Sequence, residues 1–248
     1  PAPWSEMYDP EEISLLPGWT EEARSQDVDY NSGFFPHENL TEKKMKKIIS
    51  YYYAMISMID HQVGRMIEIL KEKGLYDNTL IIFTSDHGDY MGYHHMVLKQ
   101  NHMYEPLVKV PLIIKYPESR EKGRSKKMIS NIDVAPTILN EAGLESGEYM
   151  SGHVITSDEE EREYIYAEDV NQREYMVRSE TRKLLLNKNE EFSQFFDLEK
   201  DPYETNNLID DPDYKEEVDK FKELLYRWIL FEEPTPVYLN EEAEVIDQ

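Results

Sequence analysis

A cluster of histidine, aspartate and lysine side chains around residues 86–102 holds the groups in this sequence that are able to do chemistry. Four of the seven histidines fall here, and Asp86, Asp89 and Lys99 lie among them. These histidines are His87, His94, His95 and His102. A carboxylate and an imidazole at successive positions, as at Asp86 and His87, can face one ion, and such mixed ligands suit several divalent cations. The cluster therefore indicates a metal-dependent hydrolase.

Lys99 and His94 are the candidates for binding an anionic substrate. A lysine that follows a loop rich in glycine and histidine can bring its ammonium to a sulfate or phosphate oxygen and stabilise the charge. A histidine in that loop can give a proton to a leaving oxygen or donate a hydrogen bond to the anion. A lone lysine usually serves solubility, and an isolated Asp-His pair is as often a turn beside a surface histidine, so these assignments depend on their neighbours. Calcium or magnesium also needs six or more ligands, so further donors must come from elsewhere, including a substrate oxyanion.

The segment before the cluster predicts the strand that positions it. Leu80 to Phe83 is a continuous apolar run, as a strand covered on both faces requires, and turn residues from Ser85 to Gly88 end it. We expect a parallel strand here, with Asp86 and His87 at its carboxyl end. Ligands of open α/β sheets gather outside the carboxyl ends of strands, so this is a suitable place for a reaction.

Helices and a second strand surround this predicted strand. Thr41 is a suitable N-cap, and Gly74 a suitable C′ residue, for an amphipathic helix between them. Its apolar residues recur at intervals of three and four: Met45, Ile48, Tyr52, Met55, Ile59, Val63, Met66, Ile67 and Leu70. A second buried strand is predicted over 110–116, and a helix from near Asp133 to Gly143. Helix, strand, loop and strand in this order are typical of an α/β fold.

The last part of the chain contains short strand candidates that follow one another closely. They lie at 163–167, 174–179, 182–187 and 194–198, and they predict an antiparallel meander. An amphipathic helix is predicted at about 213–231. The chain is therefore divided into an irregular segment at 1–40, part of an α/β core at 41–156, and a C-terminal antiparallel subdomain with a helix and an acidic tail at 157–248.

The composition excludes several classes of protein. The 248 residues include 27 basic and 51 acidic side chains, and the net charge of −24 disfavours binding to nucleic acid or to an anionic membrane. No apolar run approaches the roughly 20 residues of a membrane span. The absence of cysteine excludes disulfides, thiolate zinc sites and a cysteine nucleophile within these residues. No targeting segment is visible, and since the first residue is Pro1 rather than Met, the compartment is left open.

Several motifs, in a fixed order, carry a resemblance to a known family. They are Asp60-His-Gln-Val-Gly64, Asp77-Asn-Thr-Leu-Ile-Ile-Phe-Thr-Ser-Asp-His-Gly88, Met91-Gly-Tyr-His94, Lys99, Tyr104-Glu105, Val110-Pro-Leu-Ile-Ile114, Asp133-Val-Ala-Pro-Thr-Ile-Leu139 and Phe196-Asp-Leu-Glu-Lys-Asp-Pro-Tyr-Glu-Thr-Asn-Asn-Leu208. With these motifs the chain resembles the sulfatase family of the alkaline-phosphatase superfamily. The resemblance implies a mixed central sheet between helices, with a smaller C-terminal antiparallel sheet and helix. It also implies a sulfated small molecule or carbohydrate as the substrate.

The same resemblance implies roles for the residues of the cluster. Asp86 and His87 match ligands of the divalent metal, which is usually calcium in this family. Lys99 matches a residue that contacts the sulfate group. His94 matches a residue of the same pocket, near the sulfate or the leaving group. The segment 1–40 resembles a loop that crosses the substrate side of such enzymes.

Two parts of the family's active site have no counterpart in these residues. Sulfatases carry near their N-terminus an aspartate pair that completes the metal site, and a Cys-x-Pro-x-Arg or Ser-x-Pro-x-Arg motif whose first residue becomes the formylglycine nucleophile. The resemblance therefore implies a C-terminal portion of a sulfatase that is inactive alone, with formylglycine expected only in the missing N-terminal part. Such a portion should leave a sheet edge and an apolar face uncovered, which formation of a homo-oligomer or pairing with the missing half would cover.

Two other functions stay open. A phosphodiesterase or phosphonate monoester hydrolase of the same superfamily also uses Asp-His-Gly after a strand, and only the nucleophile with its flanking residues distinguishes it from a sulfatase. A non-catalytic remnant, which binds a partner or an anion without turnover, is the alternative from a different class. The presence of Asp86, His87 and Lys99 favours an active parent enzyme.

Overall fold

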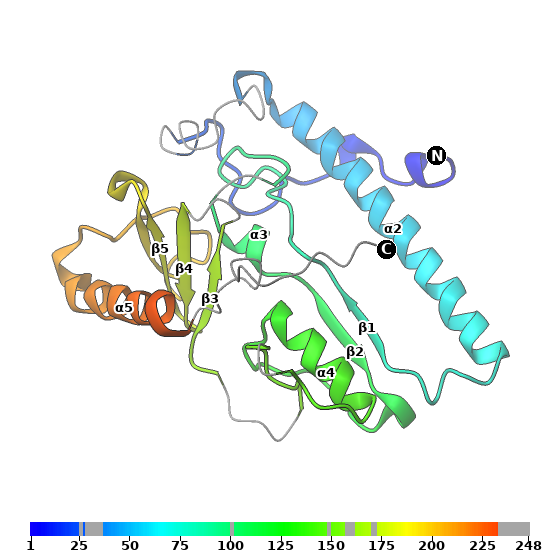
Figure 1. The fold of residues 1–248 in the computed structure, drawn as a ribbon. Helices are drawn as coiled ribbons and strands as arrows, with labels where there is room; N and C mark the ends of the chain where they lie inside the picture. Colours follow the sequence, from blue (N-terminus) through cyan, green and yellow to red (C-terminus); the bar gives the residue numbers. More distant parts are fainter. Residues whose placement is uncertain are drawn as a thin grey trace, which may run out of the picture.

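The chain has an α/β fold with two antiparallel sheets in the part that the computed structural model describes, namely residues 1–24, 27, 37–99, 102–147, 150–156, 162–169 and 173–232. Its helices are α2 (Glu42–Glu72), α3 (Glu105–Val108), α4 (Val134–Glu141) and α5 (Lys215–Arg227). Its strands are β1 (Ile81–Thr84), β2 (Leu112–Lys115), β3 (Ile165–Glu168), β4 (Glu174–Arg178), β5 (Arg182–Asn187) and β6 (Gln194–Asp197). Short 3₁₀ segments lie at Trp4–Glu6, Pro10–Glu12, His37–Asn39, Pro117–Ser119, Asn131–Asp133, Glu190–Phe192 and Pro212–Tyr214, and a π-helical turn lies at Trp228–Glu232. Figure 1 shows α2 along one side, β1 and β2 with α4 in the middle, and β3 to β5 with α5 on the other side.

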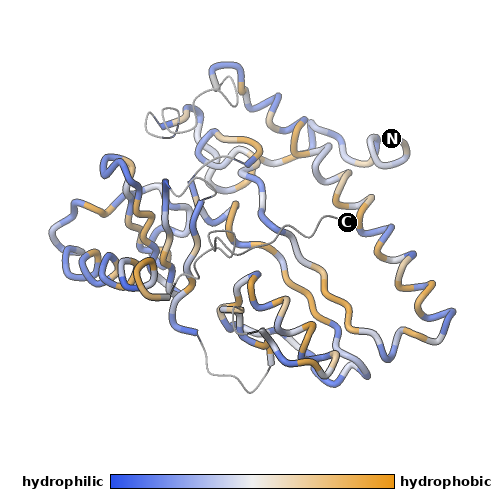
Figure 2. The backbone as a smooth tube through the Cα atoms, viewed as in Figure 1, coloured by the Kyte–Doolittle hydropathy of each residue, from blue (hydrophilic) through white to orange (hydrophobic). Residues whose placement is uncertain are grey.

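Helix α2 confirms the predicted amphipathic helix, but only its beginning is buried. Thr41 is the N-cap, and its hydroxyl accepts a hydrogen bond from the backbone of Lys44 (3.3 Å). Met45 and Ile49 are fully buried in a cluster with Ile13. Figure 2 shows that hydrophobic residues continue along the helix, and the later ones are about half exposed: Met55, Ile56, Ile59, Met66 and Ile69. Neither α2 nor any other described helix is long and apolar enough to cross a membrane.

Strands β1 and β2 pair antiparallel, so the prediction of a parallel strand is wrong. Thr84, at the end of β1, lies opposite Leu112 at the start of β2. The reason lies in the long connection between the strands. The backbone N–H of Gly88 donates to the carbonyl of Leu107 (2.8 Å), which brings the two ends of this connection together and reverses the chain.

The apolar sequence of the two strands predicted burial on both faces. The structure leaves one of these faces open. Phe83 and Ile113 lie opposite each other, and they are 38% and 64% exposed. Directly opposed residues in a ladder point to the same face, so this face of the β1–β2 pair is apolar and open. An uncovered apolar face was expected from the resemblance, and the described residues have one.

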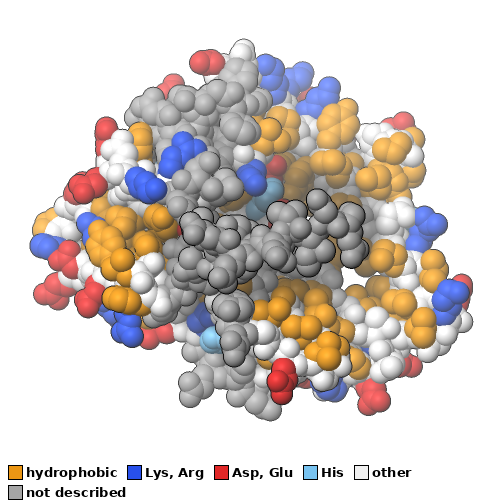
Figure 3. Space-filling model, viewed as in Figure 1, with side chains coloured by type: hydrophobic (Ala, Val, Ile, Leu, Met, Phe, Trp, Pro, Cys, Tyr) orange, Lys and Arg blue, Asp and Glu red, His pale blue; other side chains and the backbone are white. Residues whose placement is uncertain are grey.

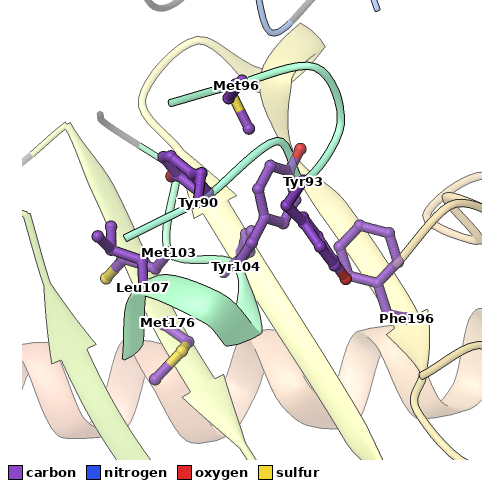
Figure 4. Close-up of a cluster of buried hydrophobic side chains, with 9 residues drawn as sticks. Tyr90, Tyr93, Met96, Met103, Tyr104, Leu107, Met176 and Phe196 are labelled. Carbon is purple, nitrogen blue, oxygen red and sulfur yellow. The ribbon is translucent and has the colours of Figure 1, made fainter. Parts of the chain in front are cut away.

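The predicted C-terminal meander is confirmed as an antiparallel sheet in the order β3-β4-β5-β6. Helix α5 covers one face of this sheet through a cluster of buried residues: Val177, Leu184, Phe195, Val218, Phe221 and Leu225. The other face packs against the connection between β1 and β2, as Figure 4 shows, through a second cluster: Tyr90, Tyr93, Met96, Met103, Tyr104, Leu107, Met176, Leu185 and Phe196. The C-terminal sheet is thus the platform on which the loop at 89–104 rests.

Candidate functional site

Asp86 and His87 lie just beyond the end of β1, where two potential metal-binding atoms come close together. Nδ1 of His87 lies 2.8 Å from the carbonyl oxygen of Gly88, which can only accept, so in the neutral ring this nitrogen carries the proton. Nε2 is then an acceptor, and it lies 3.6 Å from Oδ2 of Asp86. Metal-binding histidines usually donate their second N–H to a carbonyl or carboxylate in this way. The geometry of the pair is therefore compatible with binding of one cation.

Backbone contacts fix the turn that carries this pair. Oδ1 of Asp86 accepts the N–H of His87 (3.0 Å), and this hydrogen bond holds the pKa of Asp86 below its usual value. The side-chain amide of Asn131, at the start of the segment before α4, donates to the carbonyl of Asp86 (3.3 Å). A side chain at Gly88 would place its Cβ 1.9 Å from the carbonyl oxygen of Pro106, so only glycine fits there.

The pair offers only part of a metal site. The side chains of Asp86 and His87 are 85% and 39% exposed, so both are open to solvent. Within the residues that the structure describes, no group of three or more His, Cys, Asp or Glu side chains is arranged to hold a metal ion. Calcium takes six to eight oxygen ligands and magnesium six. The two residues fit a divalent cation by donor type, but only as members of a larger set of ligands.

His94 lies in the same loop, but its ring faces the protein interior. The ring is fully buried and stacks on Tyr93, with centroids 4.2 Å apart. Nδ1 accepts a hydrogen bond from the guanidinium of Arg24 (2.7 Å), and Nε2 donates to the carbonyl of Tyr203 (2.8 Å). Burial, together with the charge of Arg24, lowers the pKa of His94 to about 4, so the ring is neutral at pH 7. The structure therefore gives both ring nitrogens partners within the protein.

Lys99 lies at the surface, at the end of the described stretch 37–99. The loop before it has an unusual backbone, because four residues other than glycine have φ between 48° and 63°: Met91, His94, His95 and Leu98. Such conformations cost energy and concentrate at functional sites. They favour a functional role for the loop, while the roles of Lys99 and His94 remain predictions.

Arg24 anchors this loop from the N-terminal side, and sequence reasoning missed it. Its Nε lies 2.7 Å from Oδ2 of the buried Asp27, and its Nη2 contacts His94. The hydroxyl of Tyr104, at the other end of the loop, donates to Asp27 (2.9 Å). These partners are about 70 to 80 residues apart in sequence, so no local pattern could reveal the network. The segment 1–40, predicted to be irregular, thus supports the site.

Glu204 anchors the loop from the C-terminal side. Its carboxylate accepts the backbone N–H of Glu105 (2.7 Å) and lies 2.8 Å from Nζ of Lys183, which is fully buried. Nζ of Lys183 also lies 3.3 Å from the carboxylate of Glu105. Arg178 donates a hydrogen bond to this carboxylate of Glu105 (2.8 Å). Although burial by itself raises the pKa of Glu105, these two cations lower it to about 2. Glu204 belongs to the 196–208 motif, which was a usable signal even though its structural role was not predicted.

Comparison with known proteins places these residues in a wider context. The profile of the sulfatase family matches residues 17–144, and the profile described as N-sulphoglucosamine sulphohydrolase, C-terminal, matches residues 92–229. The chain is 32% identical to an arylsulfatase of Clostridium perfringens, over 90% of this chain and 48% of the relative. It is 29% identical to an N-acetylglucosamine-6-O-sulfatase of Bacteroides thetaiotaomicron, over 84% of this chain and 40% of the relative. The chain therefore spans less than half the length of these relatives.

Solved structures agree on the fold. The phosphonate monoester hydrolase of Agrobacterium radiobacter superposes with a TM-score of 0.77 at 23% identity, covering 91% of this chain and 53% of that one. The structure of BT4656 with its substrate D-glucosamine-2-N,6-O-disulfate superposes with a TM-score of 0.64 at 28% identity, covering 81% of this chain and 44% of that one. The two similarities cover 91% and 81% of this chain and about half of the other protein.

Proposed function

The chain belongs to the sulfatase family, and from this premise we propose that it is part of a sulfuric ester hydrolase that acts on sulfated carbohydrates with a divalent cation. The proposal draws on the relative named as an N-acetylglucosamine-6-O-sulfatase and on the neighbour solved with a disulfated glucosamine. Because this chain spans less than half the length of its relatives, the activity is proposed for a protein that contains these residues together with the rest of the fold.

The observation that carries the proposal is the arrangement of Asp86 and His87. With Nδ1–H directed to the Gly88 carbonyl, Nε2 of His87 lies 3.6 Å from the carboxylate of Asp86, and both groups are open to solvent. We assign these two residues as ligands of the cation, with calcium as the expected ion. When bound, the cation would neutralise the oxygens of a sulfate ester.

Lys99 and His94 are proposed for the substrate side of the site. The exposed ammonium of Lys99 would contact the sulfate, where a point charge stabilises a developing oxyanion. His94 would lie next to the sulfate or the leaving group. Since its ring is neutral at pH 7 and Nε2–H is held by the carbonyl of Tyr203, it can donate to an anion only if this hydrogen bond opens.

The remaining parts of the site are assigned to a segment outside these residues. The chain has no cysteine and no Ser-x-Pro-x-Arg sequence, so it offers no residue for formylglycine. We propose that the rest of the sulfatase fold packs against the apolar face, which we define as the exposed apolar residues of α2, β1, β2 and the α4 region. These residues are Tyr51, Met55, Ile56, Ile59, Met66, Ile69, Phe83, Ile113, Ile132 and Ile138. Figure 3 shows hydrophobic side chains gathered over α2 and over the region of β1, β2 and α4.

Turnover of aryl sulfates tests this function. We expect a longer protein that contains this chain and the nucleophile to hydrolyse the substrate, and the purified 248-residue chain to show negligible turnover. Substitution of Asp86 by Asn in the longer protein should reduce turnover strongly, because a charged ligand is lost. Robust turnover by the 248-residue chain alone would contradict the proposed division of the site.

Hydrolysis of phosphonate or phosphate esters is the second candidate function. It stays a candidate because two phosphonate monoester hydrolases share this fold and superpose with TM-scores of 0.77 and 0.75. Their identities of 23% and 22% establish a common fold and no more. Paired assays of the longer protein with an aryl sulfate and an aryl phosphonate decide between the two reactions.

A further inference from the structure

A cavity of about 540 Å³ lies where the loop before α4 meets the C-terminal sheet and helix α5. Its wall comes from residues 126–128, from residues 162–164 before β3, from the turn between β4 and β5, and from α5. It is lined by Lys126, Lys127, Met128, Arg162, Glu163, Tyr164, Ser179, Glu180, Thr181, Arg182, Glu217, Lys220 and Phe221. None of these residues belongs to the cluster at 86–99, so this cavity is a second feature of the fold.

The cavity is lined by more cationic than acidic side chains, in a strongly acidic chain. Five of its lining side chains are cationic and three are acidic, although the whole chain has a net charge of −24. Two of the cations have fixed positions because they form ion pairs. Arg162 donates to both carboxylate oxygens of Asp133 (2.6 and 2.9 Å), and Arg182 pairs with Asp197 (2.9 Å) and Glu217 (2.6 Å). These pairs fix one wall of the cavity and balance the charges of both arginines.

Lys126 and Lys220 supply the exposed cationic charges of the cavity. Both side chains are exposed, and they come from different parts of the fold. Nζ of Lys220 lies 5.6 Å from the ring centroid of Tyr164, which holds it at the edge of the cavity. Of the acidic lining residues, Glu163 accepts the hydroxyl of Tyr164 (2.7 Å), and Glu217 is paired with Arg182. An incoming anion would therefore meet the exposed ammoniums of Lys126 and Lys220, with the exposed carboxylate of Glu180 on the same wall.

The cavity lies close to the proposed site along the chain. Met128, in its wall, precedes Asn131 by three residues, and the amide of Asn131 donates to the carbonyl of Asp86 (3.3 Å). Three residues span at most about 11 Å even when fully extended. Arg162 is joined to the same region, because its partner Asp133 follows Asn131 by two residues. The cavity wall at Met128 is therefore separated from the Asp86 turn by no more than the length of a short oligosaccharide.

We propose that this cavity binds a second anionic group, a sulfate or a carboxylate, of a sulfated oligosaccharide whose scissile sulfate lies near Asp86 and His87. The ligand class rests on the proposed function, whereas the charge and the place of the cavity do not. A planar guanidinium or an ammonium is the usual partner of such oxyanions, and this cavity holds both kinds. The cavity would select longer or more highly charged substrates over a simple aryl sulfate.

Calorimetric titration of the 248-residue chain tests the inference without requiring turnover. The probes are sodium sulfate and a sulfated disaccharide, each at low and high ionic strength. We expect the disaccharide to bind more tightly than sulfate, and more weakly at high salt because surface charges are screened. Substitution Lys126→Glu or Lys220→Glu should weaken disaccharide binding about tenfold, since reversal of a charge replaces an attraction with a repulsion.

Lys122→Glu and Lys222→Glu are the matched controls, because they change the charge equally in the same loop and the same helix but do not line the cavity. They should change the affinity less than twofold. Equal weakening by all four substitutions, or binding of the disaccharide no tighter than that of sulfate, would overturn the inference. Failure of the longer protein to hydrolyse sulfate esters would refute the proposed function, but it would leave this binding result unchanged.

Discussion

At the scale of single residues, the tautomer of His87 determines what the Asp86–His87 pair is able to bind. Since Nδ1–H is directed to the Gly88 carbonyl, Nε2 presents a lone pair next to a carboxylate. We expect calcium to raise the thermal unfolding temperature of the chain, and Asp86→Asn or His87→Ala to weaken this binding at least about tenfold. Thermal unfolding at increasing calcium concentrations measures the effect.

Asp77→Asn is the control for this prediction. Asp77 is an exposed aspartate before the opposite end of β1, so its substitution removes the same charge away from the pair. It should leave the response to calcium unchanged. If the wild-type chain shows no response to calcium at all, the alternative of a non-catalytic remnant gains support.

His94 should make the stability of the chain depend on pH. Its pKa is about 4 in the folded protein, because of burial and the charge of Arg24, whereas an unfolded histidine has a pKa of about 6.5. Between these values the unfolded chain binds a proton that the folded chain does not bind, so stability is lost as the pH falls from 6.5 to 4. The loss through this residue should reach about 3 kcal/mol.

Urea unfolding of wild type and His94→Leu at several pH values between 7 and 4.5 tests this prediction. The variant is expected to be less stable at pH 7, since Arg24 loses its partner, but its stability should fall less steeply with acid. Parallel curves for the two proteins would show that His94 carries no part of the pH dependence.

The sequence identified the residues of the Asp86–His87 pair but not their surroundings. The signals that identify this pair are close together in the sequence. An apolar run, a turn and an Asp-His-Gly sequence follow one another directly, so they can be recognised without a structure. The contacts of His94 are not local, since Arg24 precedes it by 70 residues and Tyr203 follows it by 109. A histidine that looks available in the sequence is therefore found buried between two distant segments.

At the scale of elements, the C-terminal sheet holds the loop at 89–104 through a buried ion-pair cluster. Lys183 on β5 is fully buried and forms ion pairs with both Glu204 and Glu105. Lys183→Met should destabilise the protein by about 3 kcal/mol, because it removes the ion-pair partner of the fully buried Glu204 and leaves Glu105 paired with Arg178. The free energy of unfolding, measured in urea, gives the value.

Lys188→Met is the matched control for this cluster. Lys188 follows directly after β5 and is exposed, so the same substitution there should change stability by less than about 0.5 kcal/mol. Equal effects of the two substitutions would mean that Lys183 contributes no more than a surface lysine.

The elements differ in how well they could be predicted. Thr41 and the three-to-four spacing identified α2, and short, closely spaced strand candidates identified β3 to β6, because caps, periodicity and spacing are local signals. The antiparallel pairing of β1 with β2 depends on the course of the long loop between them, whose ends meet at the Gly88–Leu107 hydrogen bond. Residues this far apart leave no local signal, so the relative direction of the two strands could not be predicted. The boundaries of the three predicted regions, 1–40, 41–156 and 157–248, remain predictions.

At the scale of the whole molecule, an apolar face is combined with a large negative charge. The apolar face favours association, while the net charge of −24 opposes it at low ionic strength. We therefore expect the isolated chain to self-associate more strongly as salt is added, because screening removes the repulsion and leaves the apolar attraction. Sedimentation velocity at two protein concentrations and two salt concentrations measures this dependence.

Substitutions on and off the apolar face identify the surface responsible. Met66 and Ile113 are 65% and 64% exposed on the apolar face, and Leu230 is 70% exposed beyond α5. Met66→Lys and Ile113→Lys should shift the chain toward monomer at high salt, since each places a charge in the apolar contact. Leu230→Lys changes the net charge by the same amount, so it controls for charge and should leave association unchanged. If Leu230→Lys disperses the chain as well as the other two, apolar surface outside the apolar face takes an equal part in association, and the apolar face is not the specific surface through which the rest of the fold is joined.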